Sequence, residues 1–127
     1  MLDTTFLIDT ERGEAAANLI DDDDDVAMAA ITVAELLVGV ELSKGKAKIV
    51  RQAFVDSALV DIPVISYDVE VARTHAALLA AVRKTGRPRG AHDLLIAATA
   101  KASRRKVVTA DPDGFADLPG VEVLSHR

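Results

Sequence analysis

The chain has 127 residues, half of them apolar, with no cysteine and a formal net charge of −5. This length and composition suit a single domain over residues 1–127, and the lack of cysteine excludes disulfides, thiol metal ligands and thiol catalysis. The longest apolar run near the start, Phe6-Leu7-Ile8, is too short for a membrane span or a signal peptide. We therefore expect a cytoplasmic protein with no membrane association.

The acidic balance of the chain comes from one segment. Five consecutive acids, Asp21 to Asp25, account for the whole excess of 20 acidic over 15 basic residues. Because the remaining charges balance, net charge neither supports nor excludes nucleic-acid binding. We interpret the run itself as a solvated turn between a helix and a strand, since neighbouring like charges repel.

The first part of the chain alternates short strands and helices. Met1-Leu2 predicts a brief strand, and Thr5 is expected to cap a helical turn from Phe6 to Thr10. An alanine-rich helix is expected over Glu14 to Ile20. A strand then follows over Val26 to Ile31, an apolar run of strand length.

The middle of the chain predicts a helical hairpin. Thr32-Val33-Ala34-Glu35 has the form of a capping box, so a helix should begin at Thr32 and end near Gly45. Apolar residues then recur at helical spacing from Ile49 to Ser57. Asp61 to Ile65 contains a proline and is interpreted as an extended connector.

The last part of the chain continues the alternation. A helix over Val71 to Val82 should end at Gly86, and a second helix should run from His92 to Ala102. Lys106 to Thr109 and Val121 to Leu124 are short and β-branched, which favours strands. Strands that alternate with helices imply an α/β fold with a mainly parallel sheet covered on both faces.

Several acids, placed after predicted strands or at the starts of predicted helices, can point at the carboxyl edge of the sheet, which is where ligands bind in open α/β sheets. They are Asp3, Glu35, Asp93, Asp111 and Asp113. Carboxylates gathered in one cleft repel one another unless cations bind or their pKa values rise. Carboxylate oxygens suit Mg²⁺ or Mn²⁺, and such ions activate water for attack on phosphodiesters.

Each acid also has a structural interpretation when it is taken alone. Asp3 could satisfy backbone donors in a turn, and the capping box would explain Glu35. Asp93 is favoured by the dipole at a helix N-terminus, while Asp111 and Asp113 fit an ordinary turn around a proline. Only their joint placement favours a functional site.

Four motifs in this order resemble the PIN domain. They are Leu2 to Thr5, Ile31 to Leu36, Gly90 to Ala98, and Val107 to Asp111. The length of the chain and Gly86-Arg87-Pro88 before the third acid resemble, more narrowly, the VapC-type ribonuclease toxins of bacterial VapBC toxin–antitoxin modules. The resemblance covers nearly the whole chain.

The resemblance implies a PIN-like three-layer α/β/α sandwich whose acidic cleft binds Mg²⁺ or Mn²⁺ and cleaves RNA. It assigns the acid quartet to Asp3, Glu35, Asp93 and Asp111, and an additional metal ligand to Asp113. Thr5 and Thr109 match positions that support the site. One departure is the first strand: only Met1 and Leu2 precede Asp3, which predicts weak anchoring of that acid.

The resemblance also implies partners, namely an RNA substrate, a VapB-type antitoxin whose C-terminal segment occupies the cleft, and a second copy in a homodimer. The apolar surface from Leu36 to Phe54 is a candidate for these contacts, or else ordinary core. Eight basic residues flank Asp93 in the sequence and could form a rim that binds phosphates. They are Arg83, Lys84, Arg87, Arg89, Lys101, Arg104, Arg105 and Lys106.

Two other functions remain open from the sequence. A phosphatase-like hydrolase with an aspartyl nucleophile would also place Asp3 after the first strand, but position 5, where it needs a second acid, holds Thr5. A noncatalytic PIN-like binding module would be expected to lack some of the acids. None of the three histidines, His75, His92 and His126, is assigned to the site.

Overall fold

All paired strands run parallel in the computed structural model, which describes residues 1–14 and 20–126. The strands are β1 (Met28–Ala29) paired with β2 (Val64–Ile65), and β3 (Val107–Thr109) paired with β4 (Val123–Ser125). Leu2 joins the two pairs, because it forms a parallel bridge with Val108 and its N–H donates to the Ala27 carbonyl at 2.8 Å. The spatial order is therefore β4, β3, Leu2, β1, β2, and the predicted parallel sheet is confirmed.

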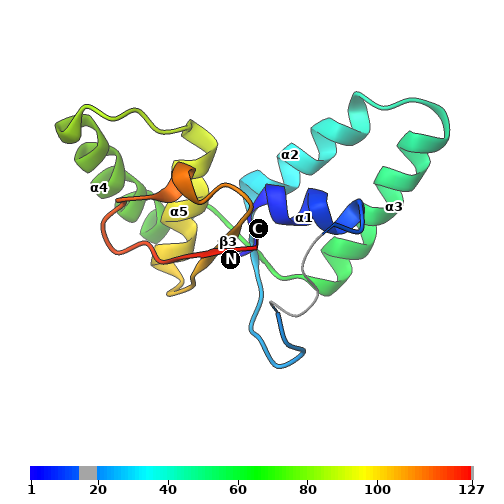
Figure 1. The fold of residues 1–127 in the computed structure, drawn as a ribbon, viewed down its shortest axis with the longest axis horizontal. Coiled ribbons are helices and arrows are strands. Elements are labelled where there is room, and N and C mark those ends of the chain that lie inside the picture. Colours follow the sequence, from blue (N-terminus) through cyan, green and yellow to red (C-terminus); the bar gives the residue numbers. More distant parts are fainter. Residues whose placement is uncertain (15–19, 127) are drawn as a thin grey trace.

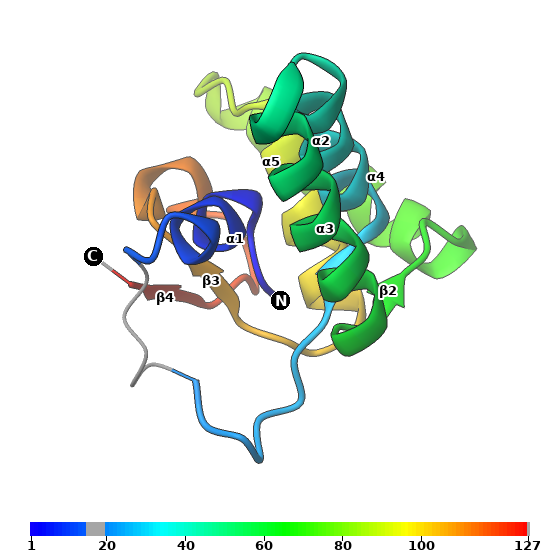
Figure 2. The ribbon, with the colours of Figure 1, turned by 90° about the vertical axis from the view of Figure 1, so that its right-hand side faces the viewer.

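Helices lie on both sides of these strands (Figures 1 and 2). The described residues form α1 (Thr4–Glu11), α2 (Ala30–Glu41), α3 (Gly45–Asp61), α4 (Val69–Thr85), α5 (Ala91–Ala102) and a short 3₁₀ helix, η1 (Pro112–Phe115). The pairs α2 and α3, and α4 and α5, pack side by side, so the predicted hairpin is confirmed. Within the described part of the chain, no helix is long and apolar enough to cross a membrane.

Successive residues of the short strands point into two different cores. Met1 and Val107 belong to a core with α4 and α5, whereas their neighbours Leu2 and Val108 belong to a core with α1, α2 and α3. Side chains alternate between the faces of a sheet, so this division places one helical layer on each face. The predicted three-layer α/β/α architecture follows from it.

The first two helices begin earlier than predicted. Asp3, not Thr5, caps α1, and its side chain accepts from the Thr4 N–H at 2.8 Å. The chain enters α2 directly from β1, with Ala29 as the cap and no side-chain capping bond. The predicted capping box is therefore wrong, because Thr32 already lies inside the helix with its side chain buried.

Some other boundaries also differ from the prediction. Helix α2 ends at Glu41, and Gly45 begins α3 instead of ending α2; its φ of 60° is a conformation that glycine adopts without strain. Gly86, with φ 69°, ends α4 as predicted. The connector expected over Asp61 to Ile65 supplies β2, and the helix expected over Glu14 to Ile20 falls mainly on residues outside the described ones.

A matched pair of substitutions measures how much the core shared by α1, α2 and α3 contributes to the free energy of unfolding. Val40 on α2 is 1% exposed, and Val60 on α3 is 84% exposed. Val40→Ala removes two buried methyl groups and should lower the free energy of unfolding by about 2 kcal/mol, from burial plus the cavity left behind. Val60→Ala should change it by less than about 0.5 kcal/mol. Urea unfolding followed by circular dichroism tests this, and equal effects of the two variants would contradict the assignment of Val40 to the core.

Candidate active site

Four of the predicted acids meet at the carboxyl edge of the sheet. Asp3 follows Leu2, Asp111 follows β3, Glu35 lies on α2 just after β1, and Asp93 lies in the first turn of α5. Their proximity affects the pKa of one of them: burial, and then the charges of Asp3, Asp111 and Glu35 in that order, raise the pKa of Asp93 to about 6. The tertiary structure therefore brings together carboxylates that are up to 108 positions apart in the chain.

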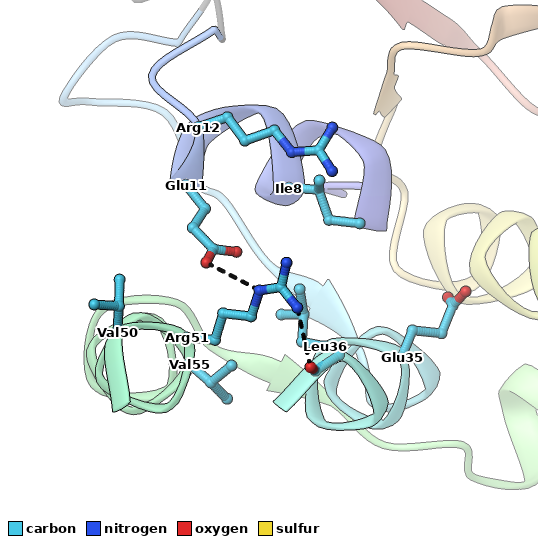
Figure 3. A pocket seen from close by; sticks show the side chains of 9 residues that line it. Ile8, Glu11, Arg12, Glu35, Leu36, Val50, Arg51 and Val55 are labelled. Atoms are coloured by element: carbon cyan, nitrogen blue, oxygen red, sulfur yellow. Dashed lines mark hydrogen bonds and ion pairs between the residues drawn. The ribbon is translucent and has the colours of Figure 1, made fainter. Parts of the chain in front are cut away.

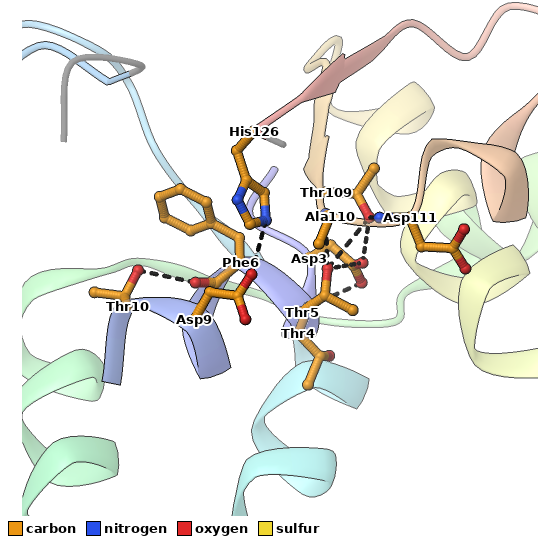
Figure 4. A network of polar contacts seen from close by, with 10 residues as sticks. All are labelled: Asp3, Thr4, Thr5, Phe6, Asp9, Thr10, Thr109, Ala110, Asp111 and His126. Carbon is orange, nitrogen blue, oxygen red and sulfur yellow. Dashed lines mark hydrogen bonds and ion pairs between the residues drawn. The ribbon is translucent and has the colours of Figure 1, made fainter. Parts of the chain in front are cut away.

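Asp3 is anchored by a set of short hydrogen bonds (Figure 4). The residue is only 3% exposed. Its Oδ1 accepts from the Thr4 N–H, and its Oδ2 accepts from the hydroxyls of Thr5 at 2.9 Å and Thr109 at 2.8 Å. Its own N–H donates to the Val108 carbonyl at 2.9 Å. The weak anchoring predicted from the short first strand is therefore wrong, because the neighbouring strand and the two threonines hold Asp3.

Backbone donors fix the direction of both hydroxyls. The Ala110 N–H donates to Thr5 Oγ1 at 3.0 Å, and the Asp111 N–H donates to Thr109 Oγ1 at 2.9 Å. Each hydroxyl accepts from the backbone and can direct its own proton to the carboxylate of Asp3. The same contacts tie the backbone of Asp111 to the threonine that holds Asp3. Rotation of Thr109 would thus disturb Asp3 and Asp111 together.

The last described residue packs beside this network. The backbone N–H of His126 donates to the Thr109 carbonyl at 3.1 Å. Its imidazole is buried, stands edge-on to Phe6 with 5.0 Å between ring centroids, and places Nε2 3.8 Å from Asp9 Oδ2 (Figure 4). His126 therefore joins α1 to β3, a structural contact that its position near the chain end did not indicate.

Glu35 is held from both sides by residues that the sequence did not assign to the site. Thr4 Oγ1 donates to Glu35 Oε1 at 2.8 Å, and His92 Nδ1 lies 3.4 Å from Glu35 Oε2. Thr32, one helical turn before Glu35 and fully buried, lies 3.4 Å from the same Thr4 hydroxyl. Thr4 and His92 are each next to a predicted acid in the sequence, and Thr32 is one helical turn before another. This proximity is the sequence feature that could have identified them as site residues.

Asp93 fits between two glycines. A Cβ atom on Gly90 would lie 3.2 Å from Asp93 Oδ2, and one on Gly114 would lie 2.9 Å from it. The same added atom on Gly114 would lie 3.4 Å from Asp111 Oδ2, so the carboxylates of Asp93 and Asp111 face a common point. A side chain at position 114 would fill that point. In the sequence, Asp-Pro-Asp-Gly fits an ordinary turn, so the role of Gly114 beside Asp93 was not predicted.

The basic residues do not form the expected continuous rim. Arg105 forms an ion pair with Asp25 at 2.9 Å, and Lys106 precedes β3, at the opposite end of that strand from Asp111. Arg104 to Lys106 therefore lie at the amino edge of the sheet, because the twelve-residue helix α5 separates them from Asp93. Nearer to Asp93, Arg87 pairs with Asp117 at 3.0 Å, and Arg89 donates to carbonyl groups of the segment around η1.

The donor set suits hard cations but is open. Carboxylate and hydroxyl oxygens surround the site, and these are the ligands that Mg²⁺ and Mn²⁺ accept. Among residues 1–14 and 20–126, no three His, Asp or Glu side chains are already arranged to hold a metal ion directly. Mg²⁺ usually retains several waters, so an open carboxylate set is compatible with it. Asp113 is exposed, and its charge is not among those that raise the pKa of Asp93.

A groove of about 270 Å³ reaches the site from the side of α1, α2 and α3 (Figure 3). Glu35 lines the groove together with apolar side chains, and Arg12 and Arg51 contribute positive charge to it. Arg51 donates to the hydroxyl of Ser43 and to the Gly39 carbonyl, and its Nε lies 3.9 Å from Glu11 Oε1. The groove is therefore amphipathic and continuous with one acid of the cluster.

Comparison with known proteins gives consistent matches. The family model described as "PIN domain" matches residues 1–121. Ribonuclease VapC1 of Rickettsia felis is 27% identical over 126 residues, which are 98% of this chain and 94% of that protein. The structure of VapBC-5 from Mycobacterium tuberculosis, a member of the VapBC family of toxin-antitoxin systems, is 34% identical with a TM-score of 0.80, and the match covers 99% of this chain and 95% of that one.

A further solved structure is also similar to this chain. FitAcB from Neisseria gonorrhoeae is 32% identical with a TM-score of 0.77, and the match covers 97% of this chain and 94% of that one. The family match extends over every element that carries an acid of the cluster. The chain therefore belongs to the PIN domain family.

Proposed function

We propose that this protein is a metal-dependent endoribonuclease and the toxin of a type II toxin–antitoxin module. The observation that carries the proposal is the group of four carboxylates at the carboxyl edge of the sheet, in which burial, and then the charges of the other three, raise the pKa of Asp93 to about 6. Like charges gathered in this way favour cation binding. The name Ribonuclease VapC1 of a relative that matches almost the whole chain supports RNA as the substrate.

The oxygen-only donor set fits Mg²⁺ or Mn²⁺, held by Asp3, Asp93 and Asp111, with Asp113 as a further ligand and Glu35 acting directly or through water. Such an ion, when bound, lowers the pKa of a coordinated water and stabilises charge on a phosphoryl oxygen. Other side chains of the protein orient the carboxylates that would hold the ion. Thr5 and Thr109 fix the Asp3 carboxylate, and Thr4 and His92 fix that of Glu35.

The two alternative functions receive less support. A phosphatase-like mechanism needs a second acid two residues after Asp3, and Thr5 at that position donates a hydrogen bond to Asp3 instead. A noncatalytic binding module would not need the four acids to be close, yet the charges of the other three act on Asp93. Ribonuclease activity therefore accounts for more of the site.

Substitution of single acids tests the reaction. Asp3→Asn and Asp93→Asn remove one charge each with little change in volume, and each should lower divalent-dependent RNA cleavage by at least about 100-fold, because metal ligands are lost. Asp22→Asn, the same change in the exposed acidic run, should leave cleavage unchanged. Gel assays on purified variants measure this. Undiminished cleavage by both site variants would end the proposal.

The raised pKa of Asp93 predicts how cation binding depends on pH. Below about pH 6 the carboxyl group holds a proton that a cation must displace. The apparent affinity for Mn²⁺ should therefore fall as the pH is lowered from 7.5 to 5, by up to about tenfold for each pH unit below 6. Titrations followed by electron paramagnetic resonance measure it. Asp93→Asn should bind more weakly but with a flatter pH profile, and parallel profiles for both proteins would contradict the assignment.

The amphipathic groove is proposed as the site of the antitoxin segment. VapBC-5 is a complex of the toxin–antitoxin type, and the groove of this chain adjoins Glu35. The candidate surface from Leu36 to Phe54 divides in the structure, since Leu36 is buried in the core whereas Ile49 and Val50 are 71% and 61% exposed. The homodimer stays a prediction, which sedimentation velocity would test.

A charge placed in the groove tests this docking site. Val50→Asp puts a carboxylate on the apolar wall and should weaken binding of the cognate antitoxin by at least about tenfold, because the charge loses solvent on binding. Val60→Asp makes the same change on α3 outside the groove and should bind normally. Calorimetry with the purified antitoxin measures both. Equal affinities would place the antitoxin elsewhere.

A further inference from the structure

Arg89 is bonded to the protein backbone and not directed freely into solvent. Its side chain donates from one nitrogen to the Asp113 carbonyl at 3.4 Å and from the other to the Ala116 carbonyl. Arg89 itself is partly buried. These two carbonyls belong to the turn that contains η1 and directly follows Asp111. The planar guanidinium, with two parallel sets of donors, thus spans a gap that a single ammonium group would not.

The two segments that Arg89 joins are the ones that enclose the carboxylate of Asp93. Gly90 is the next residue after Arg89, and a Cβ there would lie 3.2 Å from Asp93 Oδ2. Gly114 lies between Asp113 and Ala116, and a Cβ there would lie 2.9 Å from the same oxygen. The contacts of Arg89 therefore fasten the backbone on both sides of Asp93 Oδ2, which approaches closely at Gly90 and more closely than a Cβ atom normally allows at Gly114.

We propose that Arg89 is a positioning residue for the metal site, which holds the Gly90 and Gly114 backbones against Asp93 and so keeps its carboxylate directed toward Asp111. This inference rests on the proposed metal-dependent function. It also assigns Arg89 a role different from the phosphate contact expected from its charge, since both of its terminal nitrogens donate to carbonyl groups. Without the two hydrogen bonds of the Arg89 guanidinium, the turn that contains η1 would move, and the carboxylates of Asp93 and Asp111 would separate.

Arg89→Lys is the informative variant, because it keeps the charge and loses the two-pronged geometry. Mn²⁺ binding without RNA should weaken by about tenfold, the range found when groups that orient metal ligands are removed. The kcat for RNA cleavage should fall by a similar factor, while KM and the salt dependence of RNA binding stay within twofold. Arg73→Lys, the same exchange at an exposed position of α4, should match the wild type in every measurement.

Gly114→Ala gives a second route that leaves Arg89 in place. The added methyl group meets Asp93 Oδ2 and should weaken Mn²⁺ binding in the same way, whereas Gly39→Ala, where nothing lies within 4 Å of the new atom, should not. If Arg89→Lys does not fold, this pair still tests the close approach of the Gly114 backbone to Asp93, and unchanged Mn²⁺ binding by Gly114→Ala would overturn the inference.

The outcomes separate this inference from the proposed function. Mn²⁺ affinity within twofold of wild type in Arg89→Lys, or in Gly114→Ala, overturns the positioning role. A higher KM with unchanged kcat and a salt slope smaller by about one would also overturn it, in favour of a direct phosphate contact. If the wild type binds Mn²⁺ but cleaves no RNA, the proposed ribonuclease function fails, and the Mn²⁺ affinities still decide the role of Arg89.

Discussion

The buried carboxylate of Asp3 is the constraint on which the rest of the structure depends. A charge that is almost removed from solvent is costly unless hydrogen-bond donors surround it. Here the donors come from both ends of the chain, Thr5 on α1 and Thr109 on β3. They can meet only because Leu2 enters the sheet beside β3. The strand order, the start of α1 and the geometry of the acid site are therefore one connected arrangement.

A second feature of the site is the repulsion it contains. Asp93 faces three other carboxylates, and burial, followed by the charges of those neighbours, raises the pKa of its side chain to about 6. The chain tolerates this because Asp3 and Glu35 are fixed by their own donors and because glycines leave room beside Asp93. A site that is strained without a cation and relieved with one is suited to metal-dependent chemistry.

In the folded structure, the two charged runs of the sequence lie at a different place from the acid site. The run from Asp21 to Asp25 and the basic residues Arg104 to Lys106 both lie away from the acid site, and Asp25 pairs with Arg105. Much of the imbalance seen in the composition is therefore remote from the site. The net charge of −5 does not indicate what the site binds, whereas the local set of carboxylates favours cation binding.

The sequence by itself determined the alternation of strands and helices, the parallel sheet and the four acids at its carboxyl edge, because these follow from local periodicity and from a general property of α/β sheets. The tertiary structure alone decided how the acids are held. Thr32 was predicted to cap a helix and instead lies buried behind Thr4, since the chain enters α2 directly from a strand. The positive charge of Arg89 suggested that it binds phosphate, yet its side chain donates to carbonyl groups that are far from it in the sequence. Such partners are far apart in the chain, so no local pattern of residues contains them.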